Sequence, residues 1–151
     1  MKPEIEKIRT TLQTLLERLG FSVPVDHIEY PDTVYFSIHT KDSGLLIGEA
    51  GERLRALNHV VHKMIERDMP DAPKFFIDVN DYQKQKTEEL KDTARLSAQR
   101  VRYFKKEVAM PPMSAYERRI VHATLAEYPD ITTKSEGEGG ARRVFIRPLT
   151  S

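Results

Sequence analysis

The chain has 151 residues, a formal net charge of +1, and 31% charged against 39% hydrophobic residues. This length allows one large domain or two small ones, with enough apolar residues for a buried core. Cysteine is absent, which excludes a disulfide framework and a thiolate metal site. No apolar run approaches the roughly 20 residues that cross a bilayer, and the first ten residues lack the apolar segment of a signal peptide. We therefore expect a cytoplasmic protein that is not inserted into a membrane.

The two halves of the chain differ in charge. Residues 1–80 hold 10 Lys and Arg against 13 Asp and Glu, a balance of −3, whereas residues 81–151 hold 14 against 10, a balance of +4. A local positive surface suits a polyanion even when the total charge is near zero. An uneven scatter of solvated charges is the alternative, so this asymmetry is a modest indication that the second half binds nucleic acid.

Hydrophobic spacing predicts two helices and three strands in the first half of the chain. Apolar residues at intervals of three and four indicate the helices, and alternation of apolar with polar residues indicates the strands. The predicted elements are a helix at 4–19, strands at 22–30 and 33–40, a helix that closes near residue 67, and a strand at 74–80.

Two glycines, Gly48 and Gly51, stand between an apolar run that we expect to be strand-like and the second helix. Glycines at such a junction let a ligand approach the backbone, and amides at the helix start can bind phosphate oxygens. The order helix, strand, strand, G-x-x-G, helix, strand resembles a KH domain, where this loop clamps a nucleic-acid backbone. The sequence pattern LLIGxxGExLxAL resembles that of the bacterial Jag-type (KhpB-type) family. Proteins of this family join a KH domain to a C-terminal R-x-x-x-H domain.

The loop departs from the family pattern, which usually places a basic residue between the two glycines. Glu49 and Ala50 stand there instead. A carboxylate repels phosphate and itself favours the helix N-terminus, an effect of about 1 kcal/mol, which is several-fold in affinity. Arg53 is a candidate phosphate contact that would offset this charge, and Lys41 and Arg55 also lie close in sequence.

The first half offers no convincing metal or catalytic site. His59 and His62 are three residues apart on the second helix, but no third ligand joins them at a recognised spacing. Asp78 and Asp81 flank a strand end without evident partners. The sequence contains no P-loop, no nucleophile elbow and no paired-carboxylate metal signature. It therefore predicts no metal, no cofactor and no catalytic residue, and favours a binding protein over a nuclease or phosphohydrolase.

The second half begins with one long helix, predicted from about residue 81 to residue 108. Its first turns are polar, and apolar residues then recur every three or four positions. We place the domain boundary near residue 81 and expect this helix to join two modules. The basic residues that follow are either its solvated face or part of one basic surface: Arg95, Arg100, Arg102, Lys105, Lys106, Arg118 and Arg119.

A shorter helix is predicted to begin after Ser114, because two prolines precede it and Glu117 completes the S-x-x-E pattern of a capping box. In this helix Arg118 and His122 are four residues apart, so they lie on one side, one turn above the other. An arginine and a histidine held together on a rigid helix form a donor pair suited to a phosphate or a base edge.

The stretch YERRIVH, followed by TTKSEGEG and RRVFIRP, closely resembles the R-x-x-x-H (R-three-H) domain, a family associated with binding single-stranded nucleic acid. The similarity runs over about 35 residues, from Met113 to Arg147. It implies that Arg118 and His122 position the nucleic-acid backbone. The alternative from spacing alone is a solvated helix flank, with His122 packed on the sheet.

Two strands are predicted at 131–135 and 142–147, separated by a flexible EGEGG turn. In the second strand Phe145 lies between Arg143 and Arg147 on one face. An aromatic residue flanked by basic residues can stack a base and pair with phosphates. The alternative is that Phe145 packs under the long helix and only the arginines meet solvent.

We therefore predict an α+β protein with a KH-like domain at 1–80 and an R-x-x-x-H domain at 81–151, joined by the long helix. It is expected to bind single-stranded RNA, or alternatively single-stranded DNA, as a non-enzymatic post-transcriptional regulator. The resemblance implies a separate KH protein or a second copy of the chain as protein partner. The alternative function is a protein-interaction module whose KH domain has lost RNA binding. The candidate contacts are Arg118, His122, Arg119, Lys134, Arg142, Arg143, Arg147, Gly48, Gly51 and Arg53.

Overall fold

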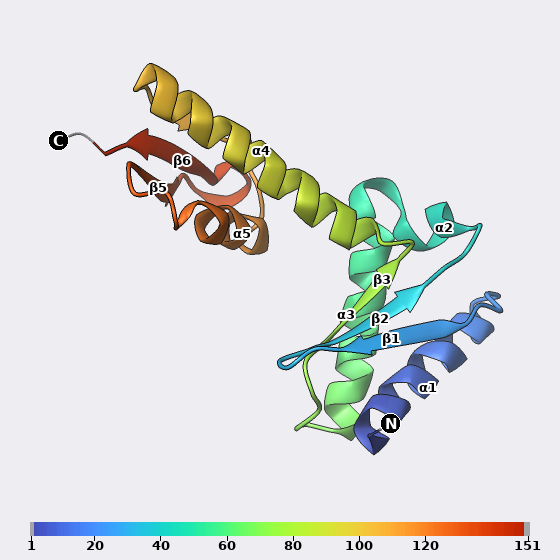
Figure 1. Cartoon of the computed structure of the whole chain (residues 1–151). Coiled ribbons are helices and arrows are strands. Elements are labelled where there is room, and N and C mark those ends of the chain that lie inside the picture. Colours follow the sequence, from blue (N-terminus) through green and yellow to red (C-terminus); the bar gives the residue numbers. More distant parts are fainter. Residues whose placement is uncertain (1, 150–151) are drawn as a thin grey trace. The chain divides into compact units, whose positions relative to one another are not determined.

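The computed structural model describes residues 2–149 and divides the chain into two compact units, one ending at Lys84 and the other beginning at Gln85 (Figure 1). Each unit combines helices with a three-stranded sheet, which confirms the predicted α+β class. The division lies near the start of the long helix α4 (Tyr82–Phe104). Within the described residues, no helix has the length and apolar character needed to cross a membrane.

The N-terminal unit is built on a sheet with strand order β1-β2-β3. Strand β1 (Val25–Glu29) is antiparallel to β2 (Val34–Ile38), and β2 is parallel to β3 (Phe75–Val79). A parallel pair requires a long crossover connection, which α3 (Glu52–Asp68) supplies. Helix α1 (Pro3–Arg18) also packs on this core, and the two long helices match the predicted ones closely.

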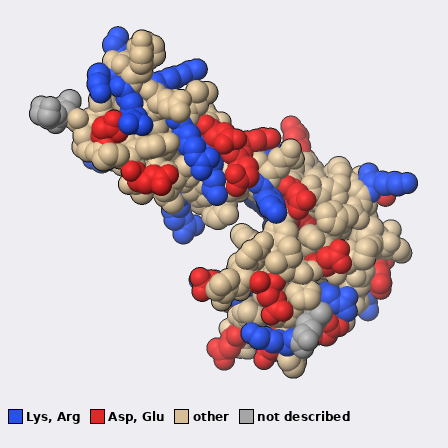
Figure 2. Space-filling view, in the orientation of Figure 1, with Lys and Arg blue, Asp and Glu red and all other residues tan. Residues whose placement is uncertain are grey.

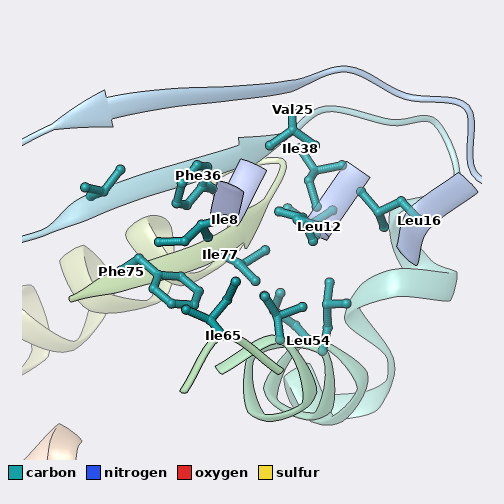
Figure 3. Close-up of a cluster of buried hydrophobic side chains, with 14 of the residues drawn as sticks. Ile8, Leu12, Leu16, Val25, Phe36, Ile38, Leu54, Ile65, Phe75 and Ile77 are labelled. Atoms are coloured by element: carbon teal, nitrogen blue, oxygen red, sulfur yellow. The ribbon is translucent and has the colours of Figure 1, made fainter. Parts of the chain in front are cut away.

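The core of this unit lies between its sheet and its two long helices (Figure 3). Ile8, Leu12 and Leu16 project from one side of α1, at the spacing that the sequence indicated. Leu54 and Ile65 from α3 meet them. Burying an aliphatic side chain of this size contributes roughly 1.5–3 kcal/mol relative to leaving it exposed. These contacts fix the positions of the strand ends and of the loops that follow the strands.

The apolar run before Gly48 is a helix, so the strand-like expectation for it is wrong. Residues Ser43–Ile47 form the short helix α2, with Leu46 buried and Leu45 exposed. Three consecutive apolar residues do not by themselves separate strand from helix. The N–H of Gly48 donates to Gly44 O at 3.0 Å, and the positive φ of Gly48 (72°) ends the turn.

Asp78 anchors the start of α4. Its buried carboxylate accepts hydrogen bonds from the backbone N–H groups of Gln83 (2.9 Å) and Lys84 (3.2 Å), where a helix start has unpaired donors. The Tyr35 hydroxyl donates to the same carboxylate at 2.6 Å. Burial, and then the Asp78 carboxylate, raise the pKa of Tyr35. Asp78, for which the sequence offered no partner, therefore ties β2 and β3 to the helix start.

The C-terminal unit has the strand order β4-β6-β5, with both pairs antiparallel. Helix α5 (Ala115–Leu125) and most of α4 pack their apolar faces on this sheet, whose core residues include Val144 and Ile146. The elements that complete the unit are β4 (Val108–Ala109), β5 (Ile131–Glu136), a single 3-10 turn (Gly139–Ala141) and β6 (Arg143–Pro148).

Helix α4 ends at Phe104, four residues before the predicted end at Val108. Lys105 adopts a left-handed conformation with φ 58°, and its N–H donates to Val101 O at 2.9 Å. This geometry closes the last turn and turns the chain away from the helix axis. Val108 then pairs with Ile146 in the sheet. The apolar position that extended the helical pattern in the sequence thus belongs to a strand.

Candidate nucleic-acid interface

Helix α5 begins with the predicted capping box. The N–H of Glu117 donates to Ser114 Oγ at 3.2 Å, and the N–H of Ser114 donates to Glu117 Oε1 at 3.1 Å. Both bonds satisfy donors that a helix start would otherwise leave unpaired, which is worth about 1 kcal/mol. One turn further, Arg118 Nη1 donates to Met113 O at 2.7 Å. The cap and this bond fix the position of the Arg118 guanidinium, which is partly buried.

His122 connects α5 to β5 through two hydroxyl groups. Its Nδ1 lies 2.7 Å from Thr133 Oγ1, and its Nε2 lies 2.8 Å from Ser135 Oγ. Burial, and then the positive charge of Arg118, lower the pKa of His122 from its ordinary value of 6.5. The imidazole is therefore neutral at pH 7, with one nitrogen donating and the other accepting.

This arrangement sets the direction of both hydroxyl groups. The hydroxyl that accepts the imidazole N–H keeps its own proton for another acceptor, and the other hydroxyl gives its proton to the ring. Thr133 and Ser135 are paired in the sheet with Ile146 and Val144, so they lie on the sheet face that carries the core and α5. His122 thus holds two hydroxyl groups near Arg118, and a phosphate oxygen could accept from the hydroxyl that keeps its proton and from the Arg118 guanidinium.

The sequence did not single out Thr133 and Ser135, although strand alternation contained the signal. Residues 131–135 were predicted as a strand, and residues two apart on a strand share one face. Neither pattern says which strand lies beside α5, so the pairing with His122 could not be read from spacing alone.

Lys134, Arg143 and Arg147 lie on the opposite face of the same sheet. Lys134 pairs with Phe145 across β5 and β6, and its neighbours along β5 point toward α5. The predicted contacts of this unit therefore do not form one cluster. Arg118 and His122 lie on the α5 side, and the basic residues of the strands lie on the outer side.

Phe145 resolves the alternative left open by the sequence. Its neighbours Val144 and Ile146 are fully buried in the core, and Phe145 points the other way. The Arg147 guanidinium carbon lies 5.2 Å from the centre of the Phe145 ring, at cation–π distance. Phe145 is half-buried on the outer sheet face and does not pack under α4.

Arg147 is held between two carboxylates. Its Nε donates to Glu107 Oε2 at 2.8 Å, and its Nη1 and Nη2 donate to the two carboxylate oxygens of Glu136 at 3.0 Å each. The hydrogen bonds that Arg147 donates to Glu136 and Glu107 raise its pKa, and the same guanidinium lowers the pKa of Glu136. Three charges that sum to −1 leave little cationic character, so Arg147 is poorly suited to its predicted role of supplying positive charge.

The other predicted basic residues of this unit keep donors toward solvent. Arg142 Nη1 donates to Gly137 O at 2.8 Å, and Arg143 Nε donates to Ala141 O at 3.2 Å, which braces the turn between β5 and β6. Arg119 is exposed on α5. Figure 2 shows Lys and Arg side chains gathered over the C-terminal unit on the face in view, with acidic side chains more prominent over the N-terminal unit.

In the N-terminal unit, two arginines fold back over the Gly48–Gly51 loop. Arg53 Nη1 donates to Leu45 O at 3.3 Å, and Arg55 Nη1 donates to Ala50 O at 2.8 Å. A Cβ on Gly48 would lie 2.7 Å from Arg53 Cγ, so a side chain there would displace the arginine stem. The loop thus receives cationic charge from the first turns of α3, although Glu49 occupies its middle.

Of the two histidines of α3, His59 is exposed and His62 has structural partners. His62 Nδ1 lies 2.6 Å from Asn58 O and its Nε2 lies 2.9 Å from Phe75 O, and the ring stacks on Phe75 with 3.9 Å between centroids. Both ring nitrogens are therefore occupied by backbone carbonyl groups. Among residues 2–149, no group of three or more potential metal ligands comes together.

Comparison with known proteins places these features in a family. Residues 88–148 match the family model of the R-x-x-x-H (R-three-H) domain. The RNA-binding protein KhpB of Bacillus subtilis is 31% identical over 144 residues, which cover 94% of this chain and 69% of the relative. KhpB of Clostridium symbiosum is 30% identical over 138 residues, covering 89% and 62%. KhpB of Lactiplantibacillus plantarum is 29% identical over 136 residues, covering 89% and 42%.

The chain belongs to the KhpB family and contains its R-x-x-x-H domain. It spans 62% of the Clostridium relative and less than half of the Lactiplantibacillus relative. The matches extend over both units, since they cover about nine tenths of this chain.

Proposed function

We propose that this protein binds single-stranded RNA through phosphate contacts and catalyses no reaction. The observation that carries the proposal is the hydroxyl pair of Thr133 and Ser135, held by a neutral His122 beside Arg118. The one hydroxyl that keeps its proton and the Arg118 guanidinium form a small donor site of the kind that binds one phosphate group. The name RNA-binding protein that the relatives carry supports RNA as the polymer.

Each residue has a distinct role in this proposal. The Arg118 guanidinium provides the charge-assisted contact, and His122 acts as a positioning residue rather than a cation. Arg119 on α5, Lys134 and Arg143 on the outer sheet face, and Arg142 in the turn between β5 and β6 attract the polymer over a longer range. Arg147 stabilises the sheet through its ion pairs and is not proposed to contact RNA. Few groups are placed to read base edges, so we expect loose sequence specificity and strong salt dependence.

We further propose that the N-terminal unit is a KH-type domain with a weakened phosphate loop. The order of its elements and the glycine pair at the start of α3 support this proposal. Gly48 and Gly51 adopt positive φ and make room for the Arg53 stem and the Tyr82 ring, and Arg53 and Arg55 offset the charge of Glu49. The proposal includes a cytoplasmic location, and a separate KH protein or a second copy as protein partner.

Fluorescence anisotropy with labelled single-stranded RNA and DNA, across a series of salt concentrations, tests the function. We expect salt-sensitive binding by the intact chain, tighter for RNA, and a loss of roughly tenfold or more in Arg118→Ala/His122→Ala. Arg18→Ala, an exposed arginine on α1, is the matched control and should bind as the intact chain does. No binding of either polymer at low salt would refute the proposal and favour the protein-interaction module.

A further inference from the structure

Helix α4 ends in two exposed aromatic side chains. Tyr103 is 80% exposed and Phe104 is 63% exposed. Their rings meet edge to face, with 4.8 Å between centroids and 79° between planes. The two rings therefore present a joint aromatic surface to solvent.

Packing within the C-terminal unit does not explain the pair. The residues of α4 that enter the core are Ala94, Ala98 and Val101, and neither ring packs against that cluster. At about 100° per residue, Tyr103 lies on the side of α4 opposite to this stripe, whereas Phe104, three residues after Val101, lies at the edge of the stripe and stays 63% exposed. The rings are thus presented outward by a helix whose other side is anchored, which gives them a fixed base.

Positive charge surrounds the two rings. Lys105 and Lys106 follow directly, and Arg100 lies one turn before Phe104; all three are exposed. The nearest acids are already engaged, since Arg102 Nε donates to Asp130 Oδ2 at 2.8 Å and Arg147 holds Glu107. The hydrogen bond from Arg102, and to a smaller extent the charges of Arg102 and Lys105, lower the pKa of Asp130. Figure 2 shows blue side chains around the end of α4.

A shallow hollow of about 420 Å³ opens beside Tyr103. Its other lining residues are Gln99, Arg102, Lys105 and Asp130. One wall is thus an aromatic ring, and the rest offers hydrogen-bonding and charged groups. The other hollow that stands out, in the N-terminal unit, is lined by four acids and two lysines and suits a polyanion poorly: Lys2, Glu4, Glu29, Asp32, Asp71 and Lys74.

We propose that Tyr103 and Phe104, with Lys105 and Lys106, form a second contact for single-stranded RNA, in which bases stack on the rings and phosphates meet the lysines. Two aromatic rings followed directly by two lysines match the chemistry of single-strand binding, where aromatic faces stack on bases and a basic surface follows the backbone. A protein ligand would not require the cations. This inference rests on the proposed function and extends it to a surface outside the Arg118 and His122 site.

We call the surface formed by Tyr103, Phe104, Lys105 and Lys106 the platform. A single tryptophan placed in it provides the direct test, because the chain contains no tryptophan. Tyr103→Trp should lose fluorescence when single-stranded RNA is added, since stacking on a base quenches indole emission. Leu96→Trp, at an exposed apolar position of α4, is the control and should keep its emission. If RNA quenched the tryptophan emission of both variants equally, or of neither, the proposed stacking contact would be wrong.

Affinity measurements separate the platform from the proposed function itself. Tyr103→Ala/Phe104→Ala should weaken RNA binding roughly fivefold or more with an unchanged salt slope, whereas Leu96→Ala should bind normally. Lys106→Gln should reduce the slope of log affinity against log salt by about 0.7. If the intact chain binds RNA and the double variant binds equally well, the platform is wrong and the function stands. If the intact chain binds no RNA, the proposed function and the platform are both wrong.

Discussion

Replacing His122 with alanine should weaken the contact between α5 and β5 and so lower the unfolding free energy of the C-terminal unit. The change removes two hydrogen bonds, of 2.7 Å to Thr133 Oγ1 and 2.8 Å to Ser135 Oγ. A neutral hydrogen bond contributes about 0.5–1.5 kcal/mol net, so the pair contributes about 1–3 kcal/mol. Because water can reach both hydroxyls once the ring is gone, we expect the lower half of that range. In a unit of this size, 1 kcal/mol lowers the melting temperature by roughly 4–8 °C.

A double-mutant cycle tests whether the hydroxyls are the reason. Urea unfolding, followed by amide signals of β5, gives the free energy of the C-terminal unit for His122→Ala, for Ser135→Ala and for both changes together. We expect a coupling energy of about 0.5–1.5 kcal/mol. The control is Thr93→Val, which removes a hydroxyl bonded to Glu89 O on α4 and should add to His122→Ala within about 0.3 kcal/mol. Full additivity of His122 with Ser135 would refute the network.

The remaining predictions concern charge and burial. Glu49→Lys should tighten RNA binding several-fold at low salt, measured by anisotropy; an unchanged affinity would exclude the loop as a contact. Arg147→Ala should lower the urea midpoint of the C-terminal unit only slightly, because its ion pairs are partly exposed, and should leave the salt slope of binding nearly unaltered. Tyr35→Phe removes the 2.6 Å bond to buried Asp78 and should destabilise the N-terminal unit by about 1–2 kcal/mol in the same assay. Since the folded pKa of His122 is lowered, the unfolded chain takes up the proton first. The His122 contribution is therefore complete above about pH 6.5 and falls as pH decreases below it. Urea midpoints from pH 5 to 8 should show this loss, reduced in His122→Ala.

Features that depend on residues three or four apart were determined by the sequence alone. The apolar faces of α1 and α3, the capping box of Ser114 and Glu117, and the common side of Arg118 and His122 all follow from the geometry of a single helix. Strand alternation likewise separated Phe145 from the core positions around it. These predictions succeeded because every atom involved belongs to one local element.

Only the tertiary structure decided which distant groups meet. His122 finds its hydroxyls 11 and 13 residues away, and Arg147 finds one of its carboxylates 40 residues away. The same holds for the short helix at Ser43–Ile47, where a run of apolar residues fits either a strand or a helix until its packing is known. Hydrogen bonds and charges act over a few ångströms, so their partners depend on which strands lie side by side. Local spacing in a sequence does not contain that information.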